Sequence, residues 1–287
     1  MDIQLKQVGR YETGFFDEGA AEISAYEPTT KRLFVVNGAT AKIDVLDLSD
    51  PQTPSKLFEI DITPFGAGVN SVAIKNGIVA AAIASDPTTE PGKVAFFDAD
   101  GNPLNSVTVG ALPDMLTFTP DGKKVLVANE GEPGDTSDPD GSVSIIDLSS
   151  GVGSATVTTA DFTAFNGKET ELRDRGIRIF PGKTAAADFE PEYIAISPDS
   201  KTAFVTLQEN NTIAIVDLKK GEISDIKPLG VKDWNQSVQL DASDKDGGIN
   251  FKNHPVLGLY QPDAIAAFAA NGATYYITAN EGDTRDE

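Results

Sequence analysis

An internal repeat runs through this chain, and the first position of its unit is an acidic residue or an amide. Five residues occupy that position: Glu22 in AEIS, Asn70 in VNSV, Asp114 in PDML, Glu192 in PEYI and Asp263 in PDAI. A turn and a β-rich stretch follow each of them, and four of the units then continue into a further strand that ends in aspartate. A unit of this size cannot bury its apolar face alone, so the repeat predicts stacked or radially arranged units.

Each unit has the pattern of an antiparallel meander. Pro-Asp-Gly at 120–122 and Pro-Asp-Ser at 198–200 separate short β-branched runs, because proline presets φ and aspartate can hydrogen-bond within its own turn. The sequence therefore predicts an all-β fold, a single β-propeller domain over residues 1–287 built from four-stranded antiparallel blades. The blades are expected to start near residues 19, 67, 111, 189 and 260.

The spacing of the units is uneven. The two longest intervals predict excursions over one face at 150–188 and 219–260, and the first of these contains ETELRDRGIRIF, a possible short helix capped by Thr170. The fifth unit reaches only TANEGDTRDE, so we expect about five blades of a seven-bladed ring, truncated within the last blade. The segment 4–11 could supply one closing strand, and the rest would come from a second chain or from a missing C-terminal segment.

Composition narrows the partners. The chain has 44 acidic and 23 basic residues and a net charge of −21, which disfavours nucleic acid and favours divalent cations. The alternative is that the acidity only keeps the surface soluble. No apolar run approaches the roughly 20 residues of a membrane-spanning helix. The chain has no cysteine, and MDIQLKQVGRYETG shows no signal peptide.

The five repeated polar residues are expected to line a central channel, because the innermost strands of a propeller face its axis. Carboxylates brought together there either bind a cation or raise the pKa of one another. The alternative is that they accept hydrogen bonds from neighbouring backbone N–H groups.

Two of the loops that follow a second strand are lengthened and acidic, at 85–93 and 129–142. Such insertions on one face of a repeat protein tend to form its binding surface. The second loop combines glycines with the hard oxygen ligands that Ca²⁺ requires, on Glu130, Glu132, Asp135, Asp138 and Asp140. It is not an EF-hand, and a solvated acidic turn is the alternative.

Ala-Asn-Glu-Gly occurs twice, at 128–131 and at 279–282, and an acidic residue follows each copy. The repetition predicts equivalent loop mouths in two blades, which adds Glu281 and Asp283 to the candidate metal ligands. The alternative is that these residues cap the turn that leaves the second strand.

Common catalytic sets are missing. The one histidine, His254, precedes a proline, and the chain contains no nucleophile elbow, P-loop or dinucleotide-binding fingerprint. Arg173, Arg175 and Arg178 could contact a phosphate or a carboxylate, although local ion pairing is the alternative in so acidic a chain.

Several ordered strings resemble the choice-of-anchor I domain. They are GAAEISAY, LFVVN, VANEGEP, ELRDRGIRIF, EPEYIAIS, TLQENN, DASDKDGGIN, YQPDAIA and TANEGD, and together they cover nearly the whole chain. The resemblance implies a bacterial β-propeller of the YVTN-like kind, located in the periplasm, at the cell surface or outside the cell. Some proteins with this domain are described as alkaline phosphatase-like or phytase-like.

Two functions follow as hypotheses. The first is a secreted or cell-surface propeller that binds Ca²⁺ and acts as a binding or scaffolding module, with a cell-surface molecule as a candidate partner. The second is a calcium-dependent phosphoesterase, in which Ca²⁺ would neutralise a phosphate ester and activate water without a histidine, serine or cysteine nucleophile. A propeller that mediates interactions inside the cell is a third reading. No catalytic residue is assigned, and whether the chain is an enzyme is left open.

Overall fold

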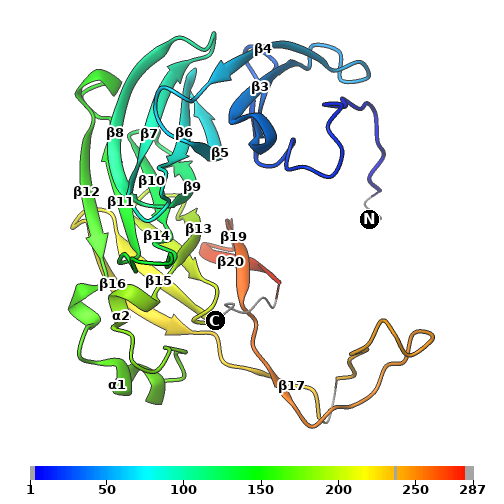
Figure 1. Cartoon of the computed structure of the whole chain (residues 1–287), viewed down its shortest axis with the longest axis vertical. Helices are drawn as coiled ribbons and strands as arrows, with labels where there is room; N and C mark the ends of the chain where they lie inside the picture. Colours follow the sequence, from blue (N-terminus) through cyan, green and yellow to red (C-terminus); the bar gives the residue numbers. More distant parts are fainter. Residues whose placement is uncertain (1–3, 236–237, 282–287) are drawn as a thin grey trace.

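The computed structural model describes residues 4–235 and 238–281. It contains four four-stranded antiparallel sheets and two two-stranded ones, of which the last along the chain continues the series of four and is called the fifth sheet. In Figure 1 the four sheets and the fifth follow one another along an arc, from β3 and β4 at the upper right, down the left side, to β19 and β20 near the centre. The all-β propeller architecture predicted from the repeat is confirmed.

Each complete blade is a meander in which consecutive strands are neighbours. The first blade consists of β1 (Ser24–Glu27), β2 (Arg32–Asn37), β3 (Lys42–Asp47) and β4 (Ser55–Asp61). The second consists of β5 (Gly68–Lys75), β6 (Ile78–Ala84), β7 (Pro91–Asp98) and β8 (Pro103–Ala111). The third consists of β9 (Pro113–Phe118), β10 (Lys124–Asn129), β11 (Ser142–Asp147) and β12 (Thr156–Asp161). The fourth consists of β13 (Pro191–Ile196), β14 (Thr202–Leu207), β15 (Thr212–Asp217) and β16 (Glu222–Pro228), and the fifth sheet of β19 (Pro262–Ala270) and β20 (Ala273–Asn280).

The aspartate that ends each third strand has a structural role. The Asp47 Oδ1 atom accepts a hydrogen bond from the Ser49 backbone N–H at 2.7 Å, and the Asp147 carboxylate does the same for Ser149 at 2.8 Å. Equivalent bonds occur at Asp98 and at Asp217. Aspartate recurs here because its short side chain can cap the turn that starts the fourth strand.

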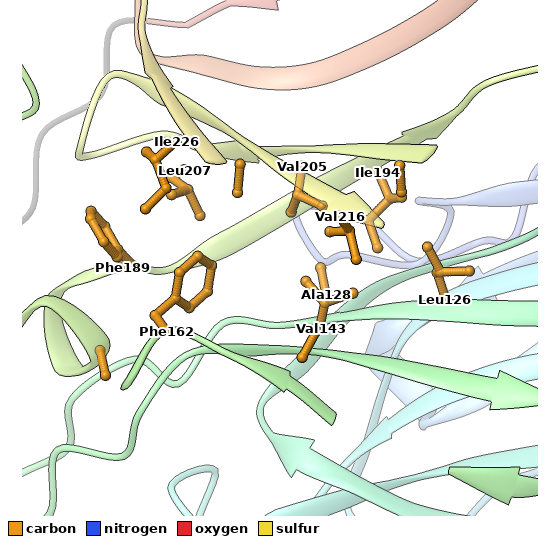
Figure 2. Close-up of a cluster of buried hydrophobic side chains, with 14 of the residues drawn as sticks. Leu126, Ala128, Val143, Phe162, Phe189, Ile194, Val205, Leu207, Val216 and Ile226 are labelled. Carbon is orange, nitrogen blue, oxygen red and sulfur yellow. The ribbon is translucent and has the colours of Figure 1, made fainter. Parts of the chain in front are cut away.

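Apolar side chains between neighbouring blades form the core. Between the third and fourth blades, Leu126 and Val143 face Val205 and Val216, all of them buried (Figure 2). Fully burying one such side chain stabilises the fold by about 1.5–3 kcal/mol. The same arrangement continues between the other blades, so each blade depends on its neighbour for a core.

The first excursion, residues 162–190, covers the end of this core. It contains η3 (Thr163–Phe165), α1 (Glu169–Asp174) and α2 (Ala185–Asp188). Phe162 and Phe189 are fully buried with ring centroids 5.2 Å apart, which fastens both ends of the excursion to the blades (Figure 2). The predicted cap is wrong: α1 begins at Glu169, one residue before Thr170, and its first turn has no side-chain cap.

The second excursion, residues 229–261, carries the short hairpin of β17 (Lys232–Asp233) and β18 (Leu257–Gly258), and it extends away from the blades at the lower right of Figure 1. The sequence predicted longer excursions, at 150–188 and 219–260. Those ranges also contain β12 and β16, the fourth strands of their blades. Among the described residues, no helix is long and apolar enough to cross a membrane.

Candidate functional site: an acidic channel beside the insertion loops

Neighbouring inner strands bring the repeated polar residues together. β1 contacts β5, β5 contacts β9, β9 contacts β13, and β13 contacts β19. Asp114, Glu192 and Asp263 each occupy the second position of their inner strand, directly after a proline, and Asn70 occupies the third position of β5. Because these residues occupy matching positions at the start of neighbouring inner strands, their side chains lie at the same height along the inner edge of the arc.

The repeated polar residues differ in their contacts and in their exposure to solvent. The Asn70 side-chain amide donates to the Pro113 carbonyl at 3.2 Å and so links two inner strands, which is the hydrogen-bonding role considered as the alternative. Glu22 is exposed and lies just before β1, where its backbone N–H donates to the Val36 carbonyl. Its carboxylate bends back toward Gly19. Carboxylates from the third and fourth blades therefore dominate the channel.

Burial and mutual repulsion raise the pKa of these carboxyl groups. Burial raises the pKa of Asp114 from 3.8 to about 6, with contributions from the charges of Asp263 and Glu22. Burial also raises the pKa of Glu192 from 4.5 to about 10, and the charges of Glu130 and Asp114 are its next largest causes. A raised pKa means that each of these carboxyl groups keeps its proton to a higher pH than an exposed carboxyl group does.

Glu130 joins this group from the end of β10. Burial raises its pKa from 4.5 to about 9, and the charges of Asp114, Glu132, Glu190 and Glu209 add to the effect. We call Asp114, Glu130 and Glu192 the channel cluster. Its members are partly buried and come from two inner strands and from the first residue after a second strand.

The other carboxylates of the 129–142 loop point elsewhere. Glu132, Asp135, Asp138 and Asp140 are exposed, and Asp138 forms an ion pair with Lys183 of the first excursion at 3.2 Å. Within residues 4–235 and 238–281, no three acidic or histidine side chains converge closely enough to hold a metal ion. Calcium binding by this loop therefore stays a prediction.

The two Ala-Asn-Glu-Gly strings do occupy equivalent places. Pro113 pairs with Asn129 in the third blade, and Pro262 pairs with Asn280 in the fifth, so Glu130 and Glu281 each directly follow a second strand. The Glu281 carboxylate accepts a hydrogen bond from the side-chain amide of Gln208, the corresponding residue of the fourth blade, at 3.4 Å. The remaining candidate ligand, Asp283, lies outside the described residues.

The insertion loops of neighbouring blades lie on the same face. The Leu112 N–H, between β8 and β9, donates to the Thr88 carbonyl in the 85–93 loop, and the Gly141 N–H donates to the Ala186 carbonyl in the first excursion. Gly141 also lies against the Phe189 carbonyl, where an added Cβ would stand only 1.9 Å from the oxygen. We call this surface, formed by 85–93, 129–142 and 162–190, the insertion face.

The three arginines of the first excursion are engaged in structural contacts. Arg173 donates to the carbonyls of Ile179 and Phe180, each at 2.9 Å. Arg175 donates to the Ile226 carbonyl at 2.7 Å and forms an ion pair with Asp225, while Arg178 donates to the Glu209 carbonyl. The contacts of Arg175 and Arg178 fasten the excursion to the fourth blade, whereas those of Arg173 lie within the excursion. An anion contact at the three guanidinium groups stays a prediction.

Sequence reasoning did not find two further acidic residues near the channel, Glu190 and Glu209. Their charges contribute to the raised pKa of Glu130. Glu190 stands two residues before Glu192, a spacing that places alternate residues of an extended chain on one side, so the string Glu-Pro-Glu was an available signal. Glu209 follows β14 in a loop that shows no acidic pattern in the sequence.

Comparison with known proteins agrees with this architecture. The model of the choice-of-anchor I domain matches residues 22–287. A mesenchyme-specific cell surface glycoprotein of Strongylocentrotus purpuratus is 42% identical over 101 residues, which are 34% of this chain and 13% of that protein.

Two solved structures show the same fold at low identity. The β-propeller domain of Cps50 (Swd1) from Myceliophteria thermophila is 11% identical, with a TM-score of 0.50, over 75% of this chain and 57% of that one. A functionally unknown protein from Desulfotomaculum acetoxidans is also 11% identical, with a TM-score of 0.51, over 78% of this chain and 61% of that one. The chain thus spans about three fifths of these propellers.

Proposed function

Because the chain belongs to the choice-of-anchor I domain family, we propose that it is the binding propeller of a surface-exposed protein, and that its channel cluster takes up Ca²⁺. The observation that carries the proposal is the accumulation of Asp114, Glu130 and Glu192, in which burial raises the pKa of each carboxyl group and neighbouring negative charges add to the effect. As placed in the structure, these three carboxylates do not form a group close enough to hold a metal ion. A divalent cation would have to draw them together, and it would take the hard oxygen ligands that they supply.

The arrangement also supports a binding role for the insertion face. Its loops come from neighbouring blades and are linked by backbone hydrogen bonds, and one of them contains Glu130 of the channel cluster. A cation in the channel would tie the inner strands of the third and fourth blades together beneath these loops. Surface location agrees with the name of the Strongylocentrotus purpuratus relative, a cell surface glycoprotein.

Calorimetric titration of Ca²⁺ into the protein at pH 8, after treatment with chelator, tests the proposal. We expect saturable binding that Glu192→Gln weakens at least tenfold. Glu90→Gln is the matched control, because it removes the same charge from an exposed position in the 85–93 loop. Absence of binding heat, or equal affinity in the two variants, would refute a channel site.

A double variant of the acidic loop separates the two candidate locations. Asp135 and Asp140 are exposed and lie on the 129–142 loop, outside the channel cluster. If Ca²⁺ binds in the channel, changing both to asparagine leaves its affinity within about threefold. A loss greater than the loss in Glu192→Gln would move the site to the loop.

A further inference from the structure

Four asparagine residues of this chain are followed directly by glycine, at Asn37, Asn76, Asn166 and Asn271. In such a pair the backbone nitrogen of the glycine can attack the side-chain amide carbon of the asparagine, because glycine carries no side chain that hinders the approach. Ammonia leaves, a five-membered succinimide ring forms, and water opens the ring to aspartate or isoaspartate. The surroundings of each pair decide where this reaction can proceed.

Three of the pairs have surroundings that oppose the reaction. Asn37 is only 2% exposed. Asn76 and Asn271 each occupy the two-residue turn of a β-hairpin, and the paired residues on both sides of each turn hold its backbone in place. A ring that joins the side chain to the next backbone nitrogen would distort these turns.

The fourth pair has room to react. Asn166 and Gly167 are exposed and lie between η3 and α1, in the first excursion. Gly167 has a φ of +81°, and a Cβ added there would meet no atom within 4 Å. The backbone can therefore rotate toward the asparagine side chain without a clash.

The attacking nitrogen of this pair is hydrogen-bonded to a carboxylate. The Gly167 N–H donates to Glu169 Oε1 at 2.9 Å, which is within the reach required of a general base. Hydrogen bonds from the backbone N–H groups of Glu169 and Gly167 lower the pKa of the Glu169 carboxyl group. This side chain is therefore ionised at neutral pH and can accept a proton.

The amide that is attacked is also hydrogen-bonded. Asn166 Oδ1 accepts from the Ala186 N–H at 2.9 Å, so a donor lies where negative charge develops on the amide oxygen during the attack. Glu169 Oε1 in turn accepts from the Ala185 N–H at 3.1 Å. The contact between residues 166–169 and 185–186 therefore positions both the base and the donor.

We propose that Asn166 is a site of self-catalysed deamidation, with Glu169 as the general base and the Ala186 N–H as the donor to the amide oxygen. The Gly167 nitrogen bonds to the amide carbon and gives its proton to Glu169. That proton passes to the side-chain nitrogen, which leaves as ammonia, and water then adds to one of the two ring carbonyls. The inference is independent of the proposed calcium site, because none of these residues belongs to the channel cluster.

The modification would act on the insertion face. Isoaspartate carries the main chain through the former side chain, so the oxygen that accepts from Ala186 would move. The Ala186 carbonyl accepts the Gly141 N–H at 3.0 Å, which links the first excursion to the 129–142 loop. Conversion at Asn166 would therefore loosen this link, and amide hydrogen exchange in the loop should become faster.

Peptide mass spectrometry of the whole chain, incubated at pH 7.4 and 37 °C, tests the proposal. The other three Asn-Gly pairs are internal controls in the same sample. We expect Asn166 to convert at least fivefold faster than each of them, and faster than it does in the chain unfolded in urea at the same pH. A rate at Asn166 no higher than at Asn76, or no higher than in urea, overturns the proposal.

A variant of the base separates catalysis from simple exposure. Glu169→Gln keeps the shape and a hydrogen-bond acceptor but cannot take the proton, so conversion at Asn166 should slow at least fivefold in the folded chain. Glu171→Gln is the matched control, because Glu171 is exposed on the same helix. In urea both variants should convert at the rate of the unchanged chain, since unfolding separates the base from the nitrogen. Equal rates for the two folded variants, with equal Tm, would refute the role of Glu169.

Discussion

Replacing Asp114 with asparagine should stabilise the protein at alkaline pH. The rise of its pKa from 3.8 to about 6 means that the fold favours the neutral carboxyl group. The difference corresponds to about 3 kcal/mol between the two protonation states. Asparagine has nearly the same shape and no charge, so the variant avoids this cost.

The sign of the effect depends on pH. A carboxyl group whose pKa is raised by folding contributes its full stability below the unfolded value of 3.8, and that contribution is lost as the pH rises through about 6. Asp114→Asn should therefore match the native protein at pH 4 and exceed it at pH 8. For a chain of 287 residues the entropy of unfolding is about 0.6 kcal/mol/K, so 3 kcal/mol raises Tm by about 5 °C.

Differential scanning calorimetry at pH 4, 6 and 8 in the presence of chelator measures this difference. The matched control is Asp121→Asn in the same blade, because hydrogen bonds from Thr119 and from the Lys123 N–H lower the pKa of Asp121. That variant should lose stability at pH 8. An equal change in Tm at pH 4 and pH 8 for Asp114→Asn, or destabilisation at pH 8, would contradict the reasoning from charge.

Three further changes test other parts of the structure. Glu130→Gln should weaken Ca²⁺ binding and flatten its rise between pH 7 and pH 10, measured by calorimetry, because the native carboxyl group, with a pKa of about 9, must lose its proton to bind the cation. Gly110→Val should cost about 1–3 kcal/mol in urea unfolding, since a Cβ there would stand 2.7 Å from the Asn129 side chain. Phe162→Ala should cost about 3–5 kcal/mol in the same assay, because it leaves a cavity beside Phe189.

The blades could be predicted from sequence because the turn residues and the apolar pattern of each repeat unit indicate the same strands. The terminal aspartates Asp47, Asp98, Asp147 and Asp217 mark the ends of third strands, and their side chains cap the turns that follow. Local turn chemistry and apolar patterning therefore specify the same strands. The bounds of the excursions were harder to predict. Their positions depend on contacts between residues far apart in the sequence, such as that between Phe162 and Phe189.

The candidate site was only partly predictable for a related reason. Asp114 and Glu192 lie on inner strands, so the phase of the repeat predicted where they meet. The 129–142 loop concentrates carboxylates in sequence, but its backbone turns most of them toward solvent and one toward Lys183. Density of acidic residues along a flexible loop does not determine which of them converge.

Glu130 combines both features, because it belongs to the acidic loop and is also positioned by a strand. It belongs to the acidic loop in sequence, yet it directly follows β10 and is held there by a hydrogen bond from its N–H to the Leu112 carbonyl. The rigid strand fixes its backbone, so its carboxylate stays near Asp114 and Glu192 while the loop beyond it extends over the insertion face. A cation bound at Glu130 would therefore act on a residue that connects the channel cluster to the 129–142 loop, which would give the proposed calcium site a direct physical route to the insertion face.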